Sequence, residues 1–112
     1  MPARVIVLAG PSGAGKSRLA ERLGLPVLGL DDFYHDGDAP GLPLITEGAN
    51  AGLVDWDHVD AWSLPDAMAA LVELCETGRT EGPDYDIARS ARIGSRVLDL
   101  HGATRFVAEG IF

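Results

Sequence analysis

The sequence contains little lysine, little cysteine and no long apolar run. Of its nine lysine and arginine residues, Lys16 is the only lysine, and 17 aspartate and glutamate residues give a formal net charge of −8 at pH 7. Nucleic acids and anionic membranes both require clusters of basic side chains, which a chain of this charge is poorly suited to provide. We therefore expect neither a nucleic-acid nor a membrane partner, and any anionic ligand must be held by a local site.

The scarcity of cysteine and of apolar runs also indicates the cellular compartment of the protein. Cys75 is the only cysteine, so the chain cannot form an internal disulfide, which fits a reducing compartment. No apolar run approaches the roughly 20 residues of a membrane-spanning helix. Residues 1–4 lead directly into an apolar segment and lack the layout of a signal peptide. These absences predict a cytoplasmic protein, and a length of 112 residues predicts one domain over residues 1–112.

The first half of the chain alternates between strand and helix patterns. Residues 4–9 form a continuous β-branched run, which predicts a strand buried on both faces of a parallel sheet. Residues 16–23 predict a helix that ends at Gly24, and residues 26–30 predict a second strand. Glycine and proline dominate residues 37–52, so we expect a long loop or a short helix fragment there.

The second half predicts one helix and two more strands. Ser63 begins a capped helix that ends at Gly78. Its apolar residues at helical spacing are expected to face the core: Leu64, Ala67, Met68, Leu71 and Cys75. Residues 79–86 predict a loop, residues 95–100 and 105–108 predict strands, and residues 101–102 predict a turn. Together these patterns predict an α/β protein with a largely parallel sheet.

The strongest motif follows the first predicted strand. Residues 10–17, GPSGAGKS, fit the phosphate-loop pattern G-x-x-x-x-G-K-[ST] in the strand-to-helix context that it requires. Glycines allow successive backbone N–H groups to surround an anion, Lys16 supplies a compact charge for the outer phosphates, and Ser17 supplies a hydroxyl for Mg²⁺. The predicted nucleotide-binding residues are Gly10, Pro11, Ser12, Gly13, Ala14, Gly15, Lys16, Ser17 and Arg18.

Acidic residues follow the other two core strands. Asp31 and Asp32 come after the second strand, where a kinase needs a carboxylate to accept the proton of the attacking hydroxyl. The pattern does not choose between them, nor between a catalytic base and a solvated loop. Glu109 follows the last strand, where an acid can hold Mg²⁺ directly or through water. Because ligands gather at the carboxyl ends of parallel strands, we expect these segments to converge.

Five segments in order resemble the uridine kinase-like nucleoside kinases, a P-loop family, over the whole chain: GPSGAGKS, DDFYHD, DWDHVDAW, YDIARSAR and VAEGIF. The resemblance implies a P-loop NTPase-type three-layer fold. It also implies transfer of the γ-phosphoryl group of ATP or GTP to the 5′-hydroxyl of a nucleoside with Mg²⁺. In the family's pattern Asp31 matches the general base and Glu109 the magnesium-linked acid.

The resemblance also implies the acceptor site. Tyr34 lies on the sugar side, Asp57 matches a ribose-binding aspartate, Tyr85 matches an aromatic residue that contacts the base, and Arg92 closes that motif. The family's Y-D-F and following histidine are replaced here by Ile87 and Ser90, which puts uridine and cytidine in doubt as acceptors. The DDF element is also similar to that of nicotinamide riboside kinases.

We therefore expect the amino-terminal portion of an ATP-dependent nucleoside kinase with Lys16 and Asp31 as catalytic residues. The sequence stops at Phe112 without the family's arginine-bearing lid, so we expect a fold that is incomplete at its carboxyl end. The alternatives are a kinase for another small alcohol, such as nicotinamide riboside, and a non-catalytic nucleotide-binding module. The sequence does not identify the acceptor or choose between ATP and GTP. It also leaves open whether the protein is a monomer or a homo-oligomer.

Overall fold

The computed structural model describes residues 2–11 and 14–110. Ser12 and Gly13 of the predicted phosphate loop lie outside the described residues. Along the chain the elements are β1 (Arg4–Ala9), α1 (Lys16–Leu23), β2 (Val27–Gly29), the 3₁₀ helices η1 (Leu30–Phe33) and η2 (Val59–Ala61), α2 (Leu64–Thr77), β3 (Arg79–Asp86), β4 (Ala91–Asp99) and β5 (Arg105–Gly110).

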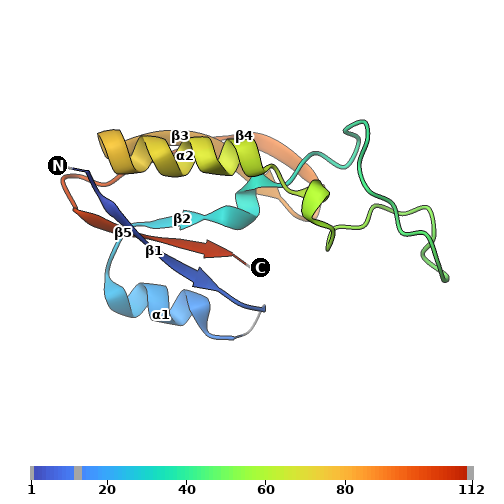
Figure 1. Ribbon diagram of the computed structural model, residues 1–112, viewed down its shortest axis with the longest axis horizontal. Helices are drawn as coiled ribbons and strands as arrows, with labels where there is room; N and C mark the ends of the chain where they lie inside the picture. The colour runs from blue at the N-terminus through green and yellow to red at the C-terminus, as the bar shows by residue number, and fades with distance from the viewer. Residues whose placement is uncertain (1, 12–13, 111–112) are drawn as a thin grey trace.

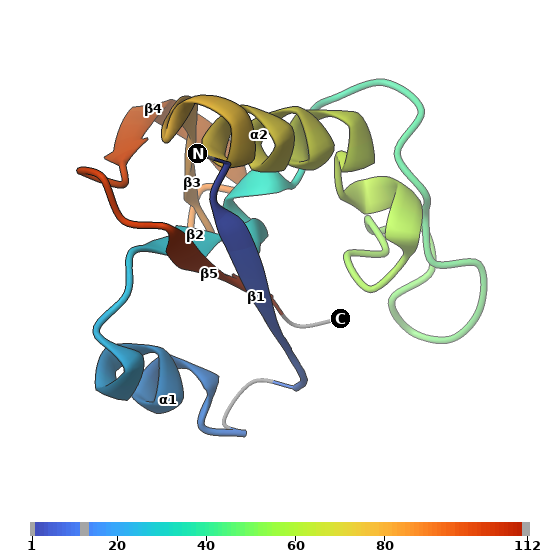
Figure 2. The same cartoon turned by 60° about the vertical axis from the view of Figure 1, so that its left-hand side comes forward.

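The centre of the fold is a parallel sheet in the order β1-β5-β2. Helix α1 lies on one face of this sheet, and α2 lies on the other with the β3-β4 hairpin beside it (Figures 1 and 2). This three-layer arrangement confirms the predicted α/β fold, and most of the predicted strands and helices appear within a few residues of their expected bounds.

The prediction that β1 is buried on both faces is wrong. Val5 is 37% exposed and Val7 is 58% exposed, whereas Phe106, Val107 and Ala108 of β5 are fully buried. Among the described strands β5 has a partner on each side, but β1 pairs only with β5. The apolar run of β1 therefore indicates a core strand by composition, while its place at the edge of the described sheet leaves alternate side chains exposed.

Glycine delimits α1 at both ends, and Gly24 is the predicted stop. Gly15 precedes the helix with a φ of 95°, and Gly24 ends it with a φ of 65° while its N–H donates to the carbonyl of Glu21. Both conformations are left-handed, and glycine adopts them without the steric penalty of a Cβ. The sharp turn at Gly15 sets the direction in which α1 leaves the phosphate loop.

Helix α2 has the predicted ends, and its predicted core face is confirmed in part. The Ser63 hydroxyl accepts from the Asp66 N–H at 3.4 Å, and Gly78 closes the last turn. Ala67, Ala70 and Leu74 are buried, and Leu71 and Cys75 pack against the same core, while Leu64 and Met68 are about half exposed. Because α2 carries apolar residues on more than one face, tertiary packing selects the stripe whose small alanines allow close approach to its neighbours.

Residues 79–86 form β3, so the loop predicted there is wrong. This strand pairs antiparallel with β4, which begins at Ala91, earlier than expected. Gly82 and Pro83 suggested a turn, but Gly82 lies against Phe33, whose ring would be 3.5 Å from a Cβ at that position. Glycine in a strand commonly marks such a close approach, and proline is tolerated in a strand with one unpaired edge.

A long irregular segment connects η1 to η2 and extends away from the sheet (Figure 1). Its β-type pairing among the described residues is limited to two isolated bridges, Leu44 with Val54 and Tyr34 with Trp62. This confirms the predicted loop over residues 37–52. Near its start the segment is held to the hairpin by Gly37, whose N–H donates to the Ser90 carbonyl at 2.7 Å. None of the helices in the described part of the chain is long and apolar enough to span a membrane.

Candidate active site

Three predicted site segments meet at the carboxyl edge of the parallel sheet. Glu109 of β5 pairs with Leu8 of β1 on one side and with Gly29 of β2 on the other. The phosphate loop begins two residues after Leu8, and Asp31 follows two residues after Gly29. The register of the sheet therefore brings the loop, Asp31 and Glu109 to one edge, as the sequence predicts.

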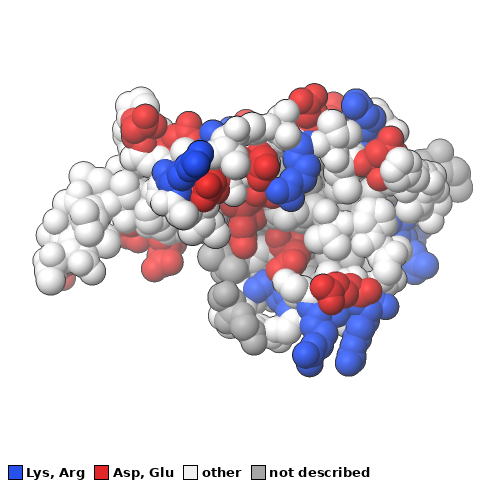
Figure 3. Space-filling view, turned by 180° about the vertical axis from the view of Figure 1, so that it is seen from behind, with Lys and Arg blue, Asp and Glu red and all other residues white. Residues whose placement is uncertain are grey.

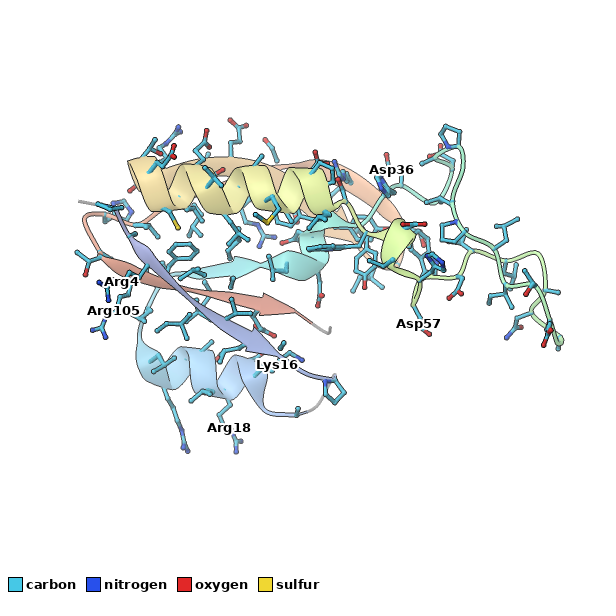
Figure 4. The ribbon with its side chains drawn as sticks, viewed as in Figure 1. Arg4, Lys16, Arg18, Asp36, Asp57 and Arg105 are labelled. Atoms are coloured by element: carbon cyan, nitrogen blue, oxygen red, sulfur yellow. The ribbon has the colours of Figure 1, made fainter. Side chains whose placement is uncertain are left out.

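The Lys16 side chain folds back over the phosphate loop. Its Nζ donates to the Gly10 carbonyl at 2.6 Å and to the Pro11 carbonyl at 3.0 Å. Figure 4 shows Lys16 close to the carboxyl ends of β1 and β5. The ammonium group is therefore held where an anion bound by the loop would lie, and a third donor remains for that anion.

The first turn of α1 adds backbone donors to the same region. Its cap is Gly15, which has no side chain to accept from the first N–H groups of the helix. Pro11 and Ala14 flank the turn and are exposed. Arg18, also predicted to bind nucleotide, is exposed on α1, and Figure 4 shows its side chain pointing away from the sheet.

Ser17 and Glu109 bring two oxygen ligands together. The Ser17 Oγ donates to Glu109 Oε1 at 3.4 Å across 92 positions of sequence. Hydroxyl and carboxylate oxygens suit Mg²⁺, which keeps several waters and usually takes only one or two protein ligands beside substrate phosphates. The described residues contain no group of three or more histidine, cysteine, aspartate or glutamate side chains that could form a dedicated metal cage. This pair fits a metal shared with a nucleotide.

The two adjacent aspartates have different surroundings. Asp32 Oδ1 accepts from the Tyr85 N–H at 3.2 Å, and its Oδ2 lies 3.9 Å from Arg96 Nη1, so Asp32 ties η1 to the hairpin. Asp31 is half-buried near Tyr34. Burial raises the pKa of the Tyr34 hydroxyl, and the charges of Asp31 and Asp57 raise it further. Asp32 therefore has a structural contact with the hairpin, whereas Asp31 lies near enough to Tyr34 for its charge to act on that hydroxyl.

A cavity of about 260 Å³ has Tyr34, three residues after Asp31, in its wall. It is lined by Tyr34, Trp56, Asp57, Tyr85, Ile87 and Ser90. The Tyr34 ring meets the Trp56 ring edge to face at a centroid distance of 6.0 Å, and its centroid is also 6.0 Å from that of Tyr85. The Tyr85 hydroxyl donates to the His35 carbonyl at 3.1 Å, which fixes one wall of the cavity.

Arg92 does not line this cavity, unlike the other predicted acceptor residues. Its Nε donates to the Tyr34 carbonyl at 3.1 Å, and its Nη2 donates to Asp66 Oδ2 at 3.0 Å. Its backbone N–H donates to Asp36 Oδ1 at 2.6 Å. The hydrogen bond from Arg92 is the main reason that the pKa of Asp66 is lowered. The guanidinium thus joins the hairpin to the residue that follows η1 and to the first turn of α2.

Sequence reasoning missed Trp56 as a wall of the cavity. The signal was present, because Trp56 directly precedes Asp57 in the DWDH motif, but an isolated tryptophan more often indicates core packing. Ile87 and Ser90, noted only as departures from the uridine kinase pattern, both line the cavity. Asp36 and Asp66, which bind Arg92, carried no signal because their partners lie far away in sequence.

The fold and this edge define the class of the chain. The first parallel strand of this α/β protein leads through a glycine-rich loop into a helix, and acidic residues follow the neighbouring strands. This arrangement is the P-loop fold. No protein-family profile matches the chain.

The similar proteins of known name are mainly uridine kinases. The chain is 26% identical to a uridine kinase of Lactobacillus helveticus and 29% identical to one of Saccharomyces cerevisiae, in each case over 96% of the chain. It spans 51% and 22% of those relatives' lengths. It is also 30% identical to the inorganic pyrophosphatase TTM2 of Arabidopsis thaliana, of which it spans 15%.

A solved structure has the same fold. A possible uridine kinase from Bacillus stearothermophilus matches 99% of this chain with a TM-score of 0.67 and 19% sequence identity, and the chain covers 62% of it. These comparisons confirm the resemblance that the motifs predict: the chain is uridine kinase-like along nearly its whole length. It spans about half, or less, of the length of the curated relatives that it matches.

Proposed function

We propose that this chain carries the phosphate-loop and acceptor-binding parts of an ATP-dependent phosphotransferase. The reaction moves the γ-phosphoryl group of ATP to the 5′-hydroxyl of a nucleoside-like small molecule. The names of the uridine kinase relatives support a nucleoside-like acceptor. One observation carries the proposal: Asp31 follows β2, whose Gly29 pairs with Glu109 at the phosphate-loop edge, and its charge helps to raise the pKa of Tyr34, a residue of the aromatic cavity wall.

The donor half of the site binds and orients the triphosphate. Backbone N–H groups of the loop and of the first turn of α1 surround the phosphates, and Lys16 places its charge on the outer ones. The Lys16 ammonium is held by the carbonyls of Gly10 and Pro11, and a charged group held in place in this way needs little reorganisation when charge moves toward the leaving oxygen. Arg18, which points away, would contribute only through the field near the loop.

The acceptor half positions the hydroxyl and takes its proton. Asp57 binds hydroxyl groups of the acceptor's sugar, and Tyr34 and Tyr85 hold its ring. Asp31 accepts the proton of the attacking hydroxyl as the bond to phosphorus forms. Asp32 cannot easily replace it, because both of its oxygens face the hairpin. Arg92 acts by holding Tyr34 rather than by contacting the acceptor.

Ser17 and Glu109 are the residues that would hold Mg²⁺. The metal, when bound, neutralises charge on the phosphates that the loop presents. The contact between the Ser17 hydroxyl and the Glu109 carboxylate keeps both oxygens at the mouth of the phosphate loop. Because Ser17 and Glu109 hold the metal, Asp31 is available as a base on the acceptor side.

An acceptor screen tests the proposal. The longest natural form of the chain is incubated with ATP, Mg²⁺ and a panel of nucleosides, and ADP release is followed with and without each acceptor. We expect release that depends on an acceptor and is lost in Lys16→Ala. Arg22→Ala, on the last turn of α1, is the matched control and should retain release. ATP bound without turnover of any acceptor would contradict a kinase.

The same assay separates the second activity named among the relatives. Inorganic pyrophosphate replaces ATP, and phosphate release is measured without acceptor. We expect none above background, because the site combines the phosphate loop with an acceptor cavity and a separate base. Release of phosphate at a rate equal to that of the best acceptor reaction would favour a phosphohydrolase instead.

A further inference from the structure

Gly37 lies behind two walls of the aromatic cavity without lining it. A Cβ at Gly37 would be 3.2 Å from the Ser90 Cβ and 3.6 Å from Trp56 Cζ2. Ser90 and Trp56 line the cavity of about 260 Å³, and they also line a neighbouring groove of about 770 Å³, to which Gly37 belongs. Ser90 and Trp56 therefore stand between two hollows of the surface, and Gly37 lies next to both side chains.

The space beside Gly37 has no room for a side chain. A separation of 3.2 Å between two Cβ atoms is tighter than ordinary van der Waals contact, so one of the two must move if a Cβ is added. The Ser90 carbonyl oxygen would be 3.3 Å away as well, and it already accepts from the Gly37 N–H at 2.7 Å. The φ of Gly37 is not positive. Its lack of a side chain therefore serves the close approach of Ser90 rather than an unusual backbone conformation.

The tip of the hairpin is held in one conformation by its own hydrogen bonds. The Ser90 N–H donates to the Ile87 carbonyl at 3.1 Å, and Asp86 Oδ1 accepts from the Ala88 N–H at 3.0 Å. Ser90 has a φ of 49°, a left-handed conformation that a residue with a Cβ adopts only where its surroundings hold it there. Because the tip is held in this way, a side chain added at Gly37 would displace the long loop instead.

The start of the long loop is bound to the hairpin at consecutive residues. The His35 carbonyl accepts from the Tyr85 hydroxyl at 3.1 Å, and Asp36 Oδ1 accepts from the Arg92 N–H at 2.6 Å. Figure 4 shows Asp36 where the long loop leaves the body of the molecule. Gly37 follows as the third residue in this series, so a shift at Gly37 acts directly on the contacts that hold the loop.

The rest of the loop has few charged groups to hold it. Glu47 is the only charged residue between positions 39 and 54, and Figure 3 shows the far end of the loop with almost no charged groups. The two arms of the loop are bound to each other, since the Asp55 N–H donates to the Pro43 carbonyl at 2.9 Å. A displacement of the outgoing arm at its start is therefore passed to the returning arm, which carries Trp56.

We propose that Gly37 is a positioning residue of the acceptor side: its lack of a side chain lets the loop meet the hairpin tip and sets the distance between Trp56 and Ser90. This inference rests on the proposed function, since it concerns the same acceptor site. A side chain at position 37 would move one of these two walls outward, so the cavity would hold its acceptor more weakly. The phosphate loop is built from other residues and would keep its affinity for ATP.

Fluorine NMR tests the position of Trp56 without any acceptor. The longest natural form of the chain is labelled with 5-fluorotryptophan, and replacement of each tryptophan by phenylalanine assigns the resonances. We expect Gly37→Ala to shift the Trp56 resonance by more than its linewidth and to leave that of Trp62, which donates to the Leu30 carbonyl, in place. Gly94→Ala is the control, because a Cβ at this glycine of the same hairpin meets open space. A Trp56 resonance that is unchanged in Gly37→Ala overturns the inference.

Steady-state kinetics test the role in acceptor binding. The acceptor is the nucleoside that gives the fastest ADP release in the acceptor screen, and its KM is measured beside the KM of ATP. We expect Gly37→Ala to raise the acceptor KM about tenfold and to keep kcat and the KM of ATP within about twofold of the wild type. A loss of folded protein would lower the apparent kcat instead. An unchanged acceptor KM, or equal rises in the two KM values, overturns the inference.

Removal of the Ser90 Cβ should relieve the effect. Ser90→Gly removes the atom that would lie 3.2 Å from the added Cβ, and glycine readily adopts a φ of 49°. In this background Gly37→Ala should raise the acceptor KM by about threefold or less, because the two substitutions act on one contact. Since Ser90 lines the cavity, each effect is taken as a ratio within one background. Equal ratios in the two backgrounds overturn the assignment of the effect to this contact.

The two measurements separate this inference from the proposed function. A shifted Trp56 resonance together with a raised acceptor KM supports both. If no nucleoside is turned over by the wild type, the kinase is contradicted, and the Trp56 resonance alone decides whether Gly37 sets the position of that wall. If a nucleoside is turned over but neither the resonance nor the acceptor KM changes in Gly37→Ala, the kinase stands and the role of Gly37 is contradicted.

Discussion

The two sides of the candidate site differ in how the fold makes them. The phosphate side is built from backbone: a glycine-rich turn, the start of α1 and the ends of three parallel strands. Lys16 and Ser17 lie in the first turn of α1, and Glu109 lies in β5. The acceptor side is built from side chains just after η1, on the long loop and at the hairpin tip, and its residues come from positions 34 to 90. Backbone geometry tolerates little variation, whereas loop side chains can change without disturbing the sheet.

This difference explains where the sequence departs from the uridine kinase pattern. The phosphate loop fits its pattern completely, while Ile87 and Ser90 replace residues in the acceptor cavity. A change on the acceptor side alters what is phosphorylated, and a change on the phosphate side removes phosphate binding altogether. The following substitutions test this contrast, beginning with the largest expected effect.

Lys16→Ala should weaken ATP binding by about 100-fold or more. The substitution removes the only ammonium group at the loop, and charge-assisted hydrogen bonds to phosphate are among the strongest in proteins. Binding is measured by calorimetry or with a fluorescent nucleotide, and Arg22→Ala serves as the control on the same helix. ATP affinity that is unchanged in Lys16→Ala would refute the phosphate side of the account.

The phosphate side could be predicted from sequence almost completely. Residues 4–24 contain strand, loop, helix and stop signal in consecutive order, so each prediction depends only on neighbouring residues. Glu109 could be placed as well, because carboxyl ends of parallel strands meet at one edge. What could not be predicted is that β1 lies at the edge of the described sheet, since an apolar run does not reveal how many neighbours a strand has.

The acceptor side could be predicted only in part. Tyr34, Asp57 and Tyr85 were expected from motifs and do line one cavity, but Trp56 was missed. The strand over residues 79–86 was mistaken for a loop because Gly82 and Pro83 are turn-forming residues whose role here depends on Phe33, far away in sequence. Arg92 was expected at the acceptor and instead binds Asp66 and the Tyr34 carbonyl. Contacts of this kind leave no local signal.

Asp32→Ala should lower the free energy of unfolding by about 1–3 kcal/mol. It removes the acceptor of the half-buried Tyr85 N–H, which then loses its hydrogen bond. Urea denaturation measures the loss. Asp84→Ala is the control, because it removes only an exposed ion pair with Arg96 and should cost less than about 1 kcal/mol. Equal losses in the two variants would contradict the structural role assigned to Asp32.

Glu109→Gln should raise the Mg²⁺ concentration for half-maximal activity by about tenfold. The amide keeps the size of the carboxylate but weakens its effect on a metal held at Ser17. Activity is titrated with Mg²⁺, and chelation with EDTA should abolish it in every variant. Glu81→Gln, an exposed change on β3, is the control. An Mg²⁺ dependence identical to that of the wild type would remove Glu109 from the metal site.

Asp66→Asn should have the smallest effect, below about 1 kcal/mol at neutral pH, because the carboxylate is about half exposed and solvent screens its pair with Arg92. The pKa of Asp66 is lowered in the folded state. The stabilisation is therefore complete above the ordinary value of 3.8 and is lost as the pH falls through the lowered pKa. Urea denaturation at pH 6 and pH 3 should show the difference between wild type and variant shrinking at low pH. A difference that grows instead would contradict the assigned sign.

The central claim is that the two sides form one phosphotransferase site with Asp31 between them. Its most direct test is transfer of label from [γ-³²P]ATP to the best acceptor by the wild type and by Asp31→Asn. The account predicts labelled acceptor with the wild type and a loss of about 100-fold or more in Asp31→Asn, with ATP affinity unchanged. Equal labelling of the acceptor by the two proteins would contradict it.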